Sequence, residues 1–332
     1  MKENIQIAEM TTMRLGGAAR YVFEIEKYED IVEAHRFAKE KGLAVFVLGE
    51  GANVIGRDEG YEGVVMVNRM RGVEVEEGVV RAMGGEVFDD LVRVSVEYGL
   101  SGIEALTSIP GTVGAGPVQN VGAYGQEFGD VIRVIRAYDF KTGESVELTR
   151  EECGFGYRRS IFNYGVDMGR YFIYEVEIEL AQATELAPPF YTSLQRYVDE
   201  NGVVDFSPAS IRRMVAEIRA EKLPDPAVEA SAGSFFKNVI VDAAEEERLK
   251  SLGAPVFDEA DRRVVPSGWL IEHSGLKGEL IHGMRVSGKA ALILINESAK
   301  SYEDLAAARE EIRRVVREKF GVSLEQEPVE MV

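Results

Sequence analysis

The first half of the chain mixes apolar residues at helical spacing with apolar runs of strand type. A helix is predicted over 29–41, where four apolar positions share one face and Gly42 follows. A second helix is predicted over 86–98, where Gly99 ends an equally one-sided pattern. Strands are predicted at the remaining apolar runs, which are 13–25 (a turn leading into an edge strand), 43–48, 64–68, 73–83 with a reversal at 76–78, 131–140, 145–148 and 171–180.

The second half is marked by residues that start helices. Ser207 and Pro208 suit the N-cap and the first position of a helix, and Asp242 with Glu245 suits a capping box. These signals predict helices over 207–222, from 242, over 266–273 and over 301–320, with a buried strand over 290–296 and a possible strand over 322–329. Because helices and strands mix without a sustained βαβ rhythm, the pattern predicts an α+β protein.

A change of composition divides the chain. The segment 182–189 ends in a Pro-Pro pair and carries no periodic apolar pattern, so a domain boundary is expected there. The 332 residues are enough for two or three domains.

Charge and composition restrict the possible partners. With 38 basic and 57 acidic residues the net charge is −19, which opposes binding to nucleic acid or to an anionic membrane. No apolar run is long enough to span a bilayer and the first residues lack the pattern of a signal peptide, so a cytoplasmic location is expected. One cysteine and three scattered histidines predict neither a disulfide nor a metal site.

Two glycine-rich stretches are the strongest chemical signal. Five of the seventeen residues in 109–125 are glycine, and the strand 43–48 leads directly into a second glycine turn at 49–56. Glycine allows main-chain N–H groups to approach an anion such as a diphosphate closely. Neither stretch is a P-loop or a G-x-G-x-x-G fingerprint, which disfavours the usual nucleotide folds. A glycine-rich surface loop remains the alternative.

Three further segments combine unusual residues. Residues 154–162 contain Arg158 and Arg159 among small residues, 232–238 place Ser234 after a glycine, and 324–328 hold two acids near an apolar end. Taken alone, each has a plain reading: an exposed ion pair, a turn serine and a solvated strand end. Ser234 lacks the G-x-S-x-G context of a hydrolase nucleophile.

Together these segments resemble the UDP-N-acetylenolpyruvoylglucosamine reductase family, in the subtype that retains a tyrosine-bearing loop. The resemblance is carried, in order, by residues 12–18, 48–54, 109–115, 119–125, 155–162, 222–226, 232–238, 268–272 and 324–327. It implies a two-lobed FAD-binding domain of the vanillyl-alcohol-oxidase/PCMH type over 1–181, with lobes of about 1–70 and 71–181. It further implies a substrate loop and linker over 182–206, an α/β UDP-sugar-binding domain over 207–320 and a C-terminal tail over 321–332.

The resemblance also implies an activity and a set of site residues. A monomer with non-covalent FAD would use NADPH to reduce UDP-N-acetylglucosamine enolpyruvate to UDP-N-acetylmuramate. Arg158, Ser234 and Glu327 would be catalytic, with Ser234 as the proton donor. The substrate would meet Tyr191, Lys222 and Asn238. FAD would meet Gly49, Glu50, Gly51, Ala52, Asn53, Ile109, Pro110, Gly111, Gly114, Ala115, Asn120, Gly122, Ala123, Tyr124 and Arg219.

Two positions depart from the family pattern. The family usually shows Leu-Glu-Pro-Glu-Val at the last motif, whereas this chain has Gln326 before Glu327 and Pro328 after it. Of the two adjacent arginines, only Arg158 falls at the family's functional position. Two other functions stay open at this point: an oxidase or dehydrogenase of the same flavin fold acting on an alcohol or sugar lactone, and a non-catalytic nucleotide-sugar sensor.

Overall fold

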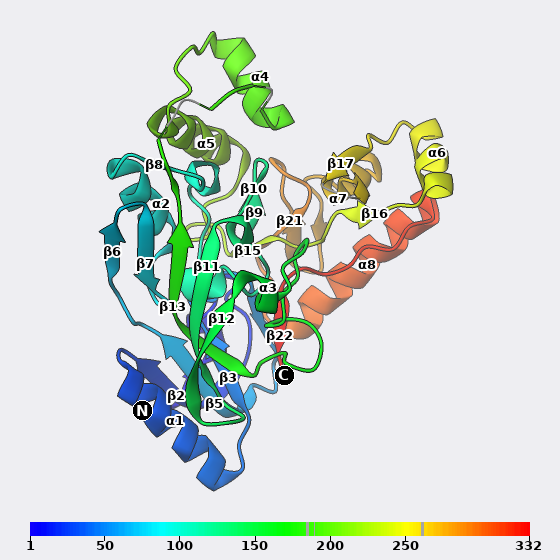
Figure 1. The fold of residues 1–332 in the computed structure, drawn as a ribbon. Helices are drawn as coiled ribbons and strands as arrows, with labels where there is room; N and C mark the ends of the chain where they lie inside the picture. The colour runs from blue at the N-terminus through cyan, green and yellow to red at the C-terminus, as the bar shows by residue number, and fades with distance from the viewer. Residues whose placement is uncertain (184–185, 189, 260–261) are drawn as a thin grey trace. The chain divides into compact units, whose positions relative to one another are not determined.

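The chain forms two compact units, each built from segments that are far apart in the sequence (Figure 1). The computed structural model describes residues 1–183, 186–188, 190–259 and 262–332. The first unit contains Met1–Glu3, Arg20–Glu50 and Glu62–Glu221, and the second contains Asn4–Ala19, Gly51–Tyr61 and Lys222–Val332. Among the described residues, no helix combines the length and the apolar character needed to cross a bilayer.

One core of the first unit lies between a sheet and a helix. The apolar face of α1 (Tyr28–Lys41) buries Ile31, Ala34 and Ala38, and Gly42 ends the helix in the left-handed conformation. The expected helix is therefore confirmed. The sheet has the order β1 (Lys2–Gln6), β2 (Ala18–Ile25), β5 (Tyr61–Asn68) and β3 (Val45–Leu48), with β3 parallel to β5.

The expectation of an edge strand over 13–25 is wrong, because β2 lies between β1 and β5. Four of the five residues of β1 are exposed, so the segment gave no apolar signal. A polar strand of this kind covers the edge that β2 would otherwise present to solvent.

The other large core of the first unit is built on an antiparallel sheet. Its order is β12 (Glu144–Thr149), β11 (Ile132–Asp139), β13 (Tyr171–Glu179), β7 (Val79–Met83) and β6 (Val73–Glu76), as the predicted hairpins required. Phe88 of α2 (Phe88–Glu97) packs edge-on against Phe128, with ring centroids 4.9 Å apart. The short elements nearby are β8 (Leu100–Ser101), β14 (Ala181–Gln182), β9 (Gly122–Ala123), β10 (Gln126–Glu127), α3 (Arg150–Cys153) and 3-10 turns at Glu104–Leu106, Val113–Ala115 and Phe128–Asp130.

Two helices near the middle of the chain pack on the first unit. Residues Leu194 and Val198 of α4 (Thr192–Asn201) share a buried cluster with Ile211 and Met214 of α5 (Pro208–Lys222). The cluster includes Ala105, which explains why α5 groups with the first unit up to Glu221 rather than starting a new domain at 207. Helix α4 lies in the segment expected to be loop and linker, and Pro189 of the expected boundary lies outside the described residues.

The second unit is organised around α8 (Tyr302–Phe320). Ser301 caps this helix in a capping box with Asp304, and Leu305, Ala308, Ile312 and Val316 form its buried face. One sheet has the order β15 (Ser231–Ser234), β21 (Ile293–Asn296), β20 (Met284–Val286) and β19 (Leu280–Ile281). Another has the order β16 (Val239–Ile240), β18 (Arg262–Val265) and β17 (Phe257–Glu259), and the other helices are α6 (Ala243–Ser251), α7 (Ser267–His273) and a 3-10 turn at Ile7–Glu9.

The C-terminal tail joins this unit in two steps. Gln326 forms an antiparallel bridge with Phe236, and β22 (Val329–Met331) then pairs in parallel with β4 (Val54–Gly56). The strand expected over 322–329 therefore begins only at its last residue. Pro328, which has no N–H to donate to a ladder, separates the two pairings.

Candidate active site

The start of the glycine turn 49–56 meets the glycine stretch 109–125 in the first unit. The N–H of Gly111 donates to the Oε2 atom of Glu50, with an N···O distance of 3.2 Å. A Cβ added to Gly49 would lie 2.5 Å from the Oγ1 atom of Thr112, so this approach requires glycine. Glu50 and Gly111, which are 61 positions apart in the sequence, are thus in hydrogen-bonding contact. A ligand can contact both turns only if they lie this close together.

Thr112 is the feature that best fits a phosphate-containing cofactor here. Its side chain is 2% exposed, and its Oγ1 atom has no hydrogen-bond partner in the part of the chain that the structure describes. A buried hydroxyl without a partner costs about 1–3 kcal/mol, which an acceptor on a ligand would recover. The Gly111 N–H already binds an anionic oxygen, that of Glu50. Both groups suit the diphosphate of FAD.

Two of the expected cofactor glycines serve the packing of the backbone. A Cβ on Gly51, which has φ +68°, would lie 2.2 Å from the carbonyl oxygen of Met10 in the second unit. A Cβ on Gly114 would lie 2.9 Å from the carbonyl oxygens of Gly84 and Ile173, and the Gly114 N–H donates to Gly84 at 2.8 Å. These positions need glycine whether or not a ligand is bound.

The side chain of Asn120 holds the second half of the glycine stretch together. Its Nδ2 donates to Glu127 at 2.6 Å and to the carbonyl of Gly156 at 3.2 Å, while its Oδ1 accepts from the N–H of Gly129 at 2.8 Å. Asn120 is thereby committed to protein partners. The hairpin of β9 and β10, which contains Gly122 and Ala123, follows it.

Tyr124 links this hairpin to the two helices α4 and α5. Its hydroxyl interacts with Arg219, and its ring meets that of Tyr191 edge-on with centroids 6.0 Å apart. Burial raises the pKa of Tyr124 despite the nearby arginine, so the phenol stays protonated near neutral pH. Burial also lowers the pKa of Arg219. The expected cofactor residues Tyr124 and Arg219 and the expected substrate residue Tyr191 therefore form one cluster.

Arg158 lies on the glycine stretch. Both terminal nitrogens of its guanidinium donate to the carbonyl of Gly122 at 3.3 Å, and its own carbonyl accepts from Asn163 at 3.0 Å. Arg159 instead stacks over the exposed ring of Tyr164, with 3.7 Å from its guanidinium carbon to the ring centroid. The two adjacent arginines thus have different surroundings, and only Arg158 contacts the predicted cofactor loop.

Ser234 and Glu327 are brought together in the second unit. Ser234 ends β15, is half-buried and follows Gly233, whose φ of +68° favours glycine. The N–H of Glu327 donates to the carbonyl of Phe235 at 3.0 Å. The main chain of Glu327 therefore lies beside Phe235, the residue that follows Ser234. Glu327 and Ser234 are 93 positions apart in the sequence.

The remaining predicted residues lie at element ends or make local backbone contacts. Asn238 accepts from the N–H of Ser267 at 3.3 Å at the start of α7, and Lys222 is exposed at the end of α5. The carbonyl of Asn53 accepts from Val329 at 2.9 Å. Ala52 and Ile109 are partly buried, whereas Pro110 and Ala115 are exposed.

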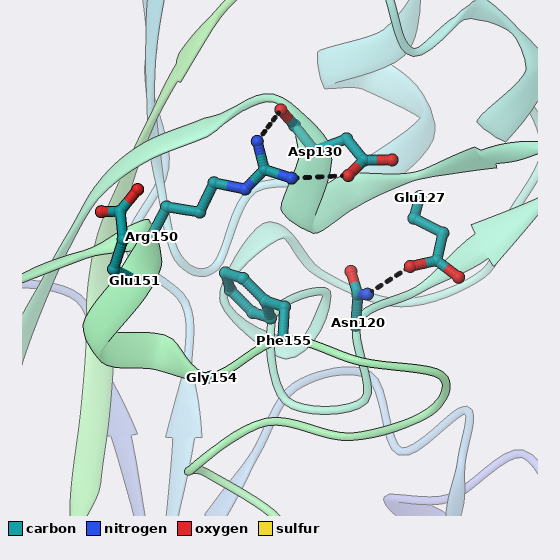
Figure 2. A pocket seen from close by; sticks show the side chains of 7 residues that line it. All are labelled: Asn120, Glu127, Asp130, Arg150, Glu151, Gly154 and Phe155. Atoms are coloured by element: carbon teal, nitrogen blue, oxygen red, sulfur yellow. Dashed lines mark hydrogen bonds and ion pairs between the residues drawn. The ribbon is translucent and has the colours of Figure 1, made fainter. Parts of the chain in front are cut away.

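An acidic pocket of about 260 Å³ lies near the glycine stretch but does not suit a diphosphate (Figure 2). Its lining is Asn120, Glu127, Asp130, Arg150, Glu151, Gly154 and Phe155. Arg150 already pairs with the Asp130 carboxylate at 2.7 Å, as the dashed lines show. Three carboxylates and one committed arginine would repel a diphosphate.

Sequence reasoning did not single out Thr112 or Gln326. Thr112 lies within the glycine-rich stretch 109–125, and this position was the only indication in the sequence that it could contact a cofactor. Gln326 was noticed only as a departure from the family pattern, and its contacts require the structure. The lone Cys153 is buried, and burial raises the pKa of its thiol to about 12, which makes it unreactive.

Comparisons with known proteins agree with this arrangement. A family of FAD-binding domains matches residues 19–149, and the C-terminal domain of UDP-N-acetylenolpyruvoylglucosamine reductase matches residues 225–331. A crystal structure of the reductase of that name from Thermus caldophilus has a TM-score of 0.69 at 24% identity, covering 99% of this chain and 98% of that one. The expected α+β fold with an FAD-binding domain is confirmed.

Two curated relatives extend over almost the whole chain. The UDP-N-acetylenolpyruvoylglucosamine reductase of Pseudomonas aeruginosa is 36% identical over 337 residues, with 99% of this chain and 98% of the relative covered. The enzyme of the same name from Escherichia coli (strain K12) is 36% identical over 332 residues, with 98% and 95% covered. On this evidence the chain belongs to the UDP-N-acetylenolpyruvoylglucosamine reductase family.

Proposed function

We propose that this chain uses NADPH to reduce UDP-N-acetylglucosamine enolpyruvate to UDP-N-acetylmuramate, a precursor of peptidoglycan. Membership of the reductase family supports the reaction and the UDP-sugar substrate. The observation that carries the proposal furthest is the meeting of both glycine turns at the buried hydroxyl of Thr112.

The cofactor is FAD, held without a covalent bond. When bound, FAD carries a hydride equivalent from NADPH to the vinyl CH₂ carbon of the enolpyruvyl group. The hydroxyl of Thr112 would donate to the diphosphate, and the N–H of Gly111 would exchange the Glu50 carboxylate for it. Tyr124 and Arg219 would contact the rest of the cofactor from their shared cluster.

Three side chains would act on the substrate. Reduction of the double bond places negative charge on the carbon next to the carboxylate, and Arg158 and Glu327 would stabilise or polarise this charge. The hydroxyl of Ser234 would give its proton to that carbon and regain one from solvent. A hydroxyl is a weak acid, but the acceptor is a carbanion, so the transfer is downhill.

The substrate's nucleotide and phosphates would be held by Tyr191, Lys222 and Asn238. Tyr191 is 49% exposed beside Tyr124, and Lys222 is exposed, so both side chains can reach a ligand. We also propose that the enzyme is cytoplasmic, because NADPH and UDP-sugars are cytoplasmic metabolites, and that it is a monomer. Size-exclusion chromatography with light scattering would test the monomer against the mass of 36.7 kDa.

A spectroscopic titration tests the function. The purified protein should be yellow, NADPH should bleach the flavin absorbance, and the enolpyruvyl UDP-sugar should restore it without oxygen. If an alcohol or a sugar lactone reduces the bound flavin instead, the protein is an oxidase or dehydrogenase of the same fold. If the protein stays colourless after incubation with FAD, the sensor hypothesis replaces the proposal.

A further inference from the structure

The side chain of Gln326 connects the C-terminal tail to α8. Its Oε1 atom accepts from Nη1 of Arg309 at 2.7 Å, and its Nε2 donates to the carbonyl of Pro328 at 2.8 Å. Both ends of the amide are therefore bonded, one to the helix and one to the main chain two residues further on. The second bond spans Glu327 and closes the chain around it.

Arg309 is itself held firmly. Its Nη1 also donates to the Oε1 atom of Glu330 at 2.8 Å, and its side chain is 15% exposed. Glu330 further accepts from the hydroxyl of Tyr302 at 2.7 Å and from Nε of Arg57 at 3.0 Å. Burial acts to raise the pKa of Glu330, but the hydrogen bonds from Arg57, Tyr302 and Arg309 outweigh it and hold the pKa at about 2. The anchor thus stays ionised at any pH at which the enzyme works.

The main chain around Glu327 is restrained on both sides as well. Before it, Gln326 bridges to Phe236 and the carbonyl of Glu325 accepts from the N–H of Lys237 at 2.9 Å. After it, Pro328 limits the backbone of the preceding residue to extended conformations. The proline itself cannot donate to the strand ladder, but its carbonyl accepts from the amide of Gln326, which ties this end of the segment to the residue before Glu327.

We propose that Gln326 is a positioning residue for Glu327: its amide fixes the tail to Arg309 and to the carbonyl of Pro328, so that the Glu327 carboxylate stays beside Ser234 during reduction of the substrate. The inference rests on the proposed catalytic role of Glu327. It also gives a function to the two positions at which this chain departs from the family pattern. The hydrogen-bonded amide of Gln326 before Glu327 and the proline at 328 after it both restrain the backbone of Glu327.

The test is a double-mutant cycle read by stopped-flow absorbance of each half-reaction. Gln326→Met keeps the length of the side chain and removes the bonds to Arg309 and Pro328, together with a longer one of 3.4 Å from Nε2 to the Oε1 atom of Glu330. We expect flavin reduction by NADPH to be unchanged and reoxidation by the enolpyruvyl substrate to slow by about 10- to 100-fold, the cost of a displaced catalytic group. Gln326→Met should add no further slowing in a Glu327→Gln background, because the amide acts through that carboxylate.

A matched control distinguishes this role from general stabilisation of the tail. Glu325→Gln removes the adjacent 2.5 Å pair with Lys237, in which Glu325 is 72% exposed, and leaves the Gln326 amide intact. Both half-reactions should then keep their rates. If Gln326→Met gives no folded, flavin-loaded protein, Gln326→Asn takes its place, because it adds no charge beside Glu330 and its shorter amide cannot reach both Arg309 and the carbonyl of Pro328.

Four results would overturn the proposal, and they point to three different causes. Unchanged reoxidation in Gln326→Met, or equal slowing with and without Glu327→Gln, removes the positioning role and leaves the role of Glu327 intact. Equal slowing by Glu325→Gln shows that any weakening of the tail has this effect. Unchanged reoxidation in Glu327→Gln alone removes the catalytic role of Glu327, and the role of Gln326 falls with it.

Discussion

The N–H of Glu327 donates to the carbonyl oxygen of Phe235, with an N···O distance of 3.0 Å. With the bond from the N–H of Lys237 to the carbonyl of Glu325, it fixes the tail next to the end of β15, where Ser234 stands. Ser234, the proposed proton donor, and Glu327, which would polarise the developing charge, thus lie on paired segments of the second unit. Their relative position depends on backbone pairing and not on flexible side chains, which is how a catalytic pair is best held.

Removing the buried hydroxyl of Thr112 should weaken FAD binding without destabilising the protein that lacks FAD, because the hydroxyl has no protein partner to lose among the described residues. Thr112→Val keeps the shape and removes an Oγ1 atom that has no protein partner among the described residues. One lost hydrogen bond of 0.5–1.5 kcal/mol weakens FAD binding by roughly 2- to 13-fold. Fluorescence titration of the apoprotein with FAD measures the affinity, and thermal unfolding of the apoprotein measures the stability.

Thr107→Val is the control for that substitution. Its Oγ1 donates to the carbonyl of Glu104 at 2.8 Å in an equally buried place. This variant should lower the unfolding temperature of the apoprotein and leave the FAD affinity unchanged. The opposite pattern in the two variants would remove Thr112 from the cofactor site.

The flavin should be released by acid. The glycine turns at 49–56 and 109–125 contain neither histidine nor cysteine, the residues to which flavins are usually attached. Trichloroacetic acid precipitation should therefore leave all the yellow colour in the supernatant. Colour that stays in the washed pellet would show a covalent bond.

Of the adjacent arginines, only Arg158 should be important for the reaction. Arg158→Ala should lower kcat by roughly 10²–10³-fold, the usual loss when one donor to a developing charge is removed. Arg159→Ala loses only an exposed contact with Tyr164, worth about 0.5–1 kcal/mol, and should change kcat by less than about threefold. Steady-state kinetics of both variants decide, and equal losses would mean that the assignment within this segment is wrong.

The buried pair of Asp139 and Arg170 should make stability depend on pH in acid. Hydrogen bonds from Arg170 hold the pKa of Asp139, which is 1% exposed, at about 2. This pKa is lower in the folded than in the unfolded chain. The ionised Asp139 carboxylate therefore contributes fully to the free energy of unfolding above about pH 4, and this contribution is lost as the pH falls towards 2. Asp139→Asn should lower the free energy of unfolding by about 1–2 kcal/mol at pH 6, a range that is reduced for screening of the pair by solvent.

The difference in unfolding free energy between the unmodified protein and Asp139→Asn should shrink between pH 4 and pH 2. Urea unfolding of both proteins over this pH range measures it. Asp130→Asn serves as the control, because its pair with Arg150 is exposed and should contribute about 0–1 kcal/mol. A cost of Asp139→Asn that stays constant down to pH 2 would contradict the low pKa.

The parts of the fold that the sequence predicted well are those with local signals. The sequence predicts that the last helix begins at Ser301 and ends before Gly321. In the structure α8 spans Tyr302–Phe320, with Ser301 and Gly321 as its caps. The polar strand β1 and helix α4 were missed, because β1 shows no apolar alternation and α4 buries only Leu194 and Val198. Their stability comes from partners elsewhere in the chain, which no short window reveals.

Domain membership was harder to predict for the same reason. Met13 and Ile55 pack in the same core as Leu305, so two N-terminal segments belong to the second unit. The glycine turns were recognised from composition, but their contact through Glu50 and Gly111 is a tertiary fact. The residue roles came from family resemblance, whereas the contacts that restrain Glu327 could be found only in the structure.

Stopped-flow absorbance of Ser234→Ala tests the central assignment most directly. The variant loses one hydroxyl, and reduction of the flavin by NADPH needs no proton from it, so bleaching should keep its normal rate. Reoxidation by the enolpyruvyl substrate should slow by about 10²–10⁴-fold, the usual value of general acid catalysis, or roughly 3–5 kcal/mol of barrier. If instead the variant slows flavin reduction as much as reoxidation, Ser234 is structural and the proton comes from another group.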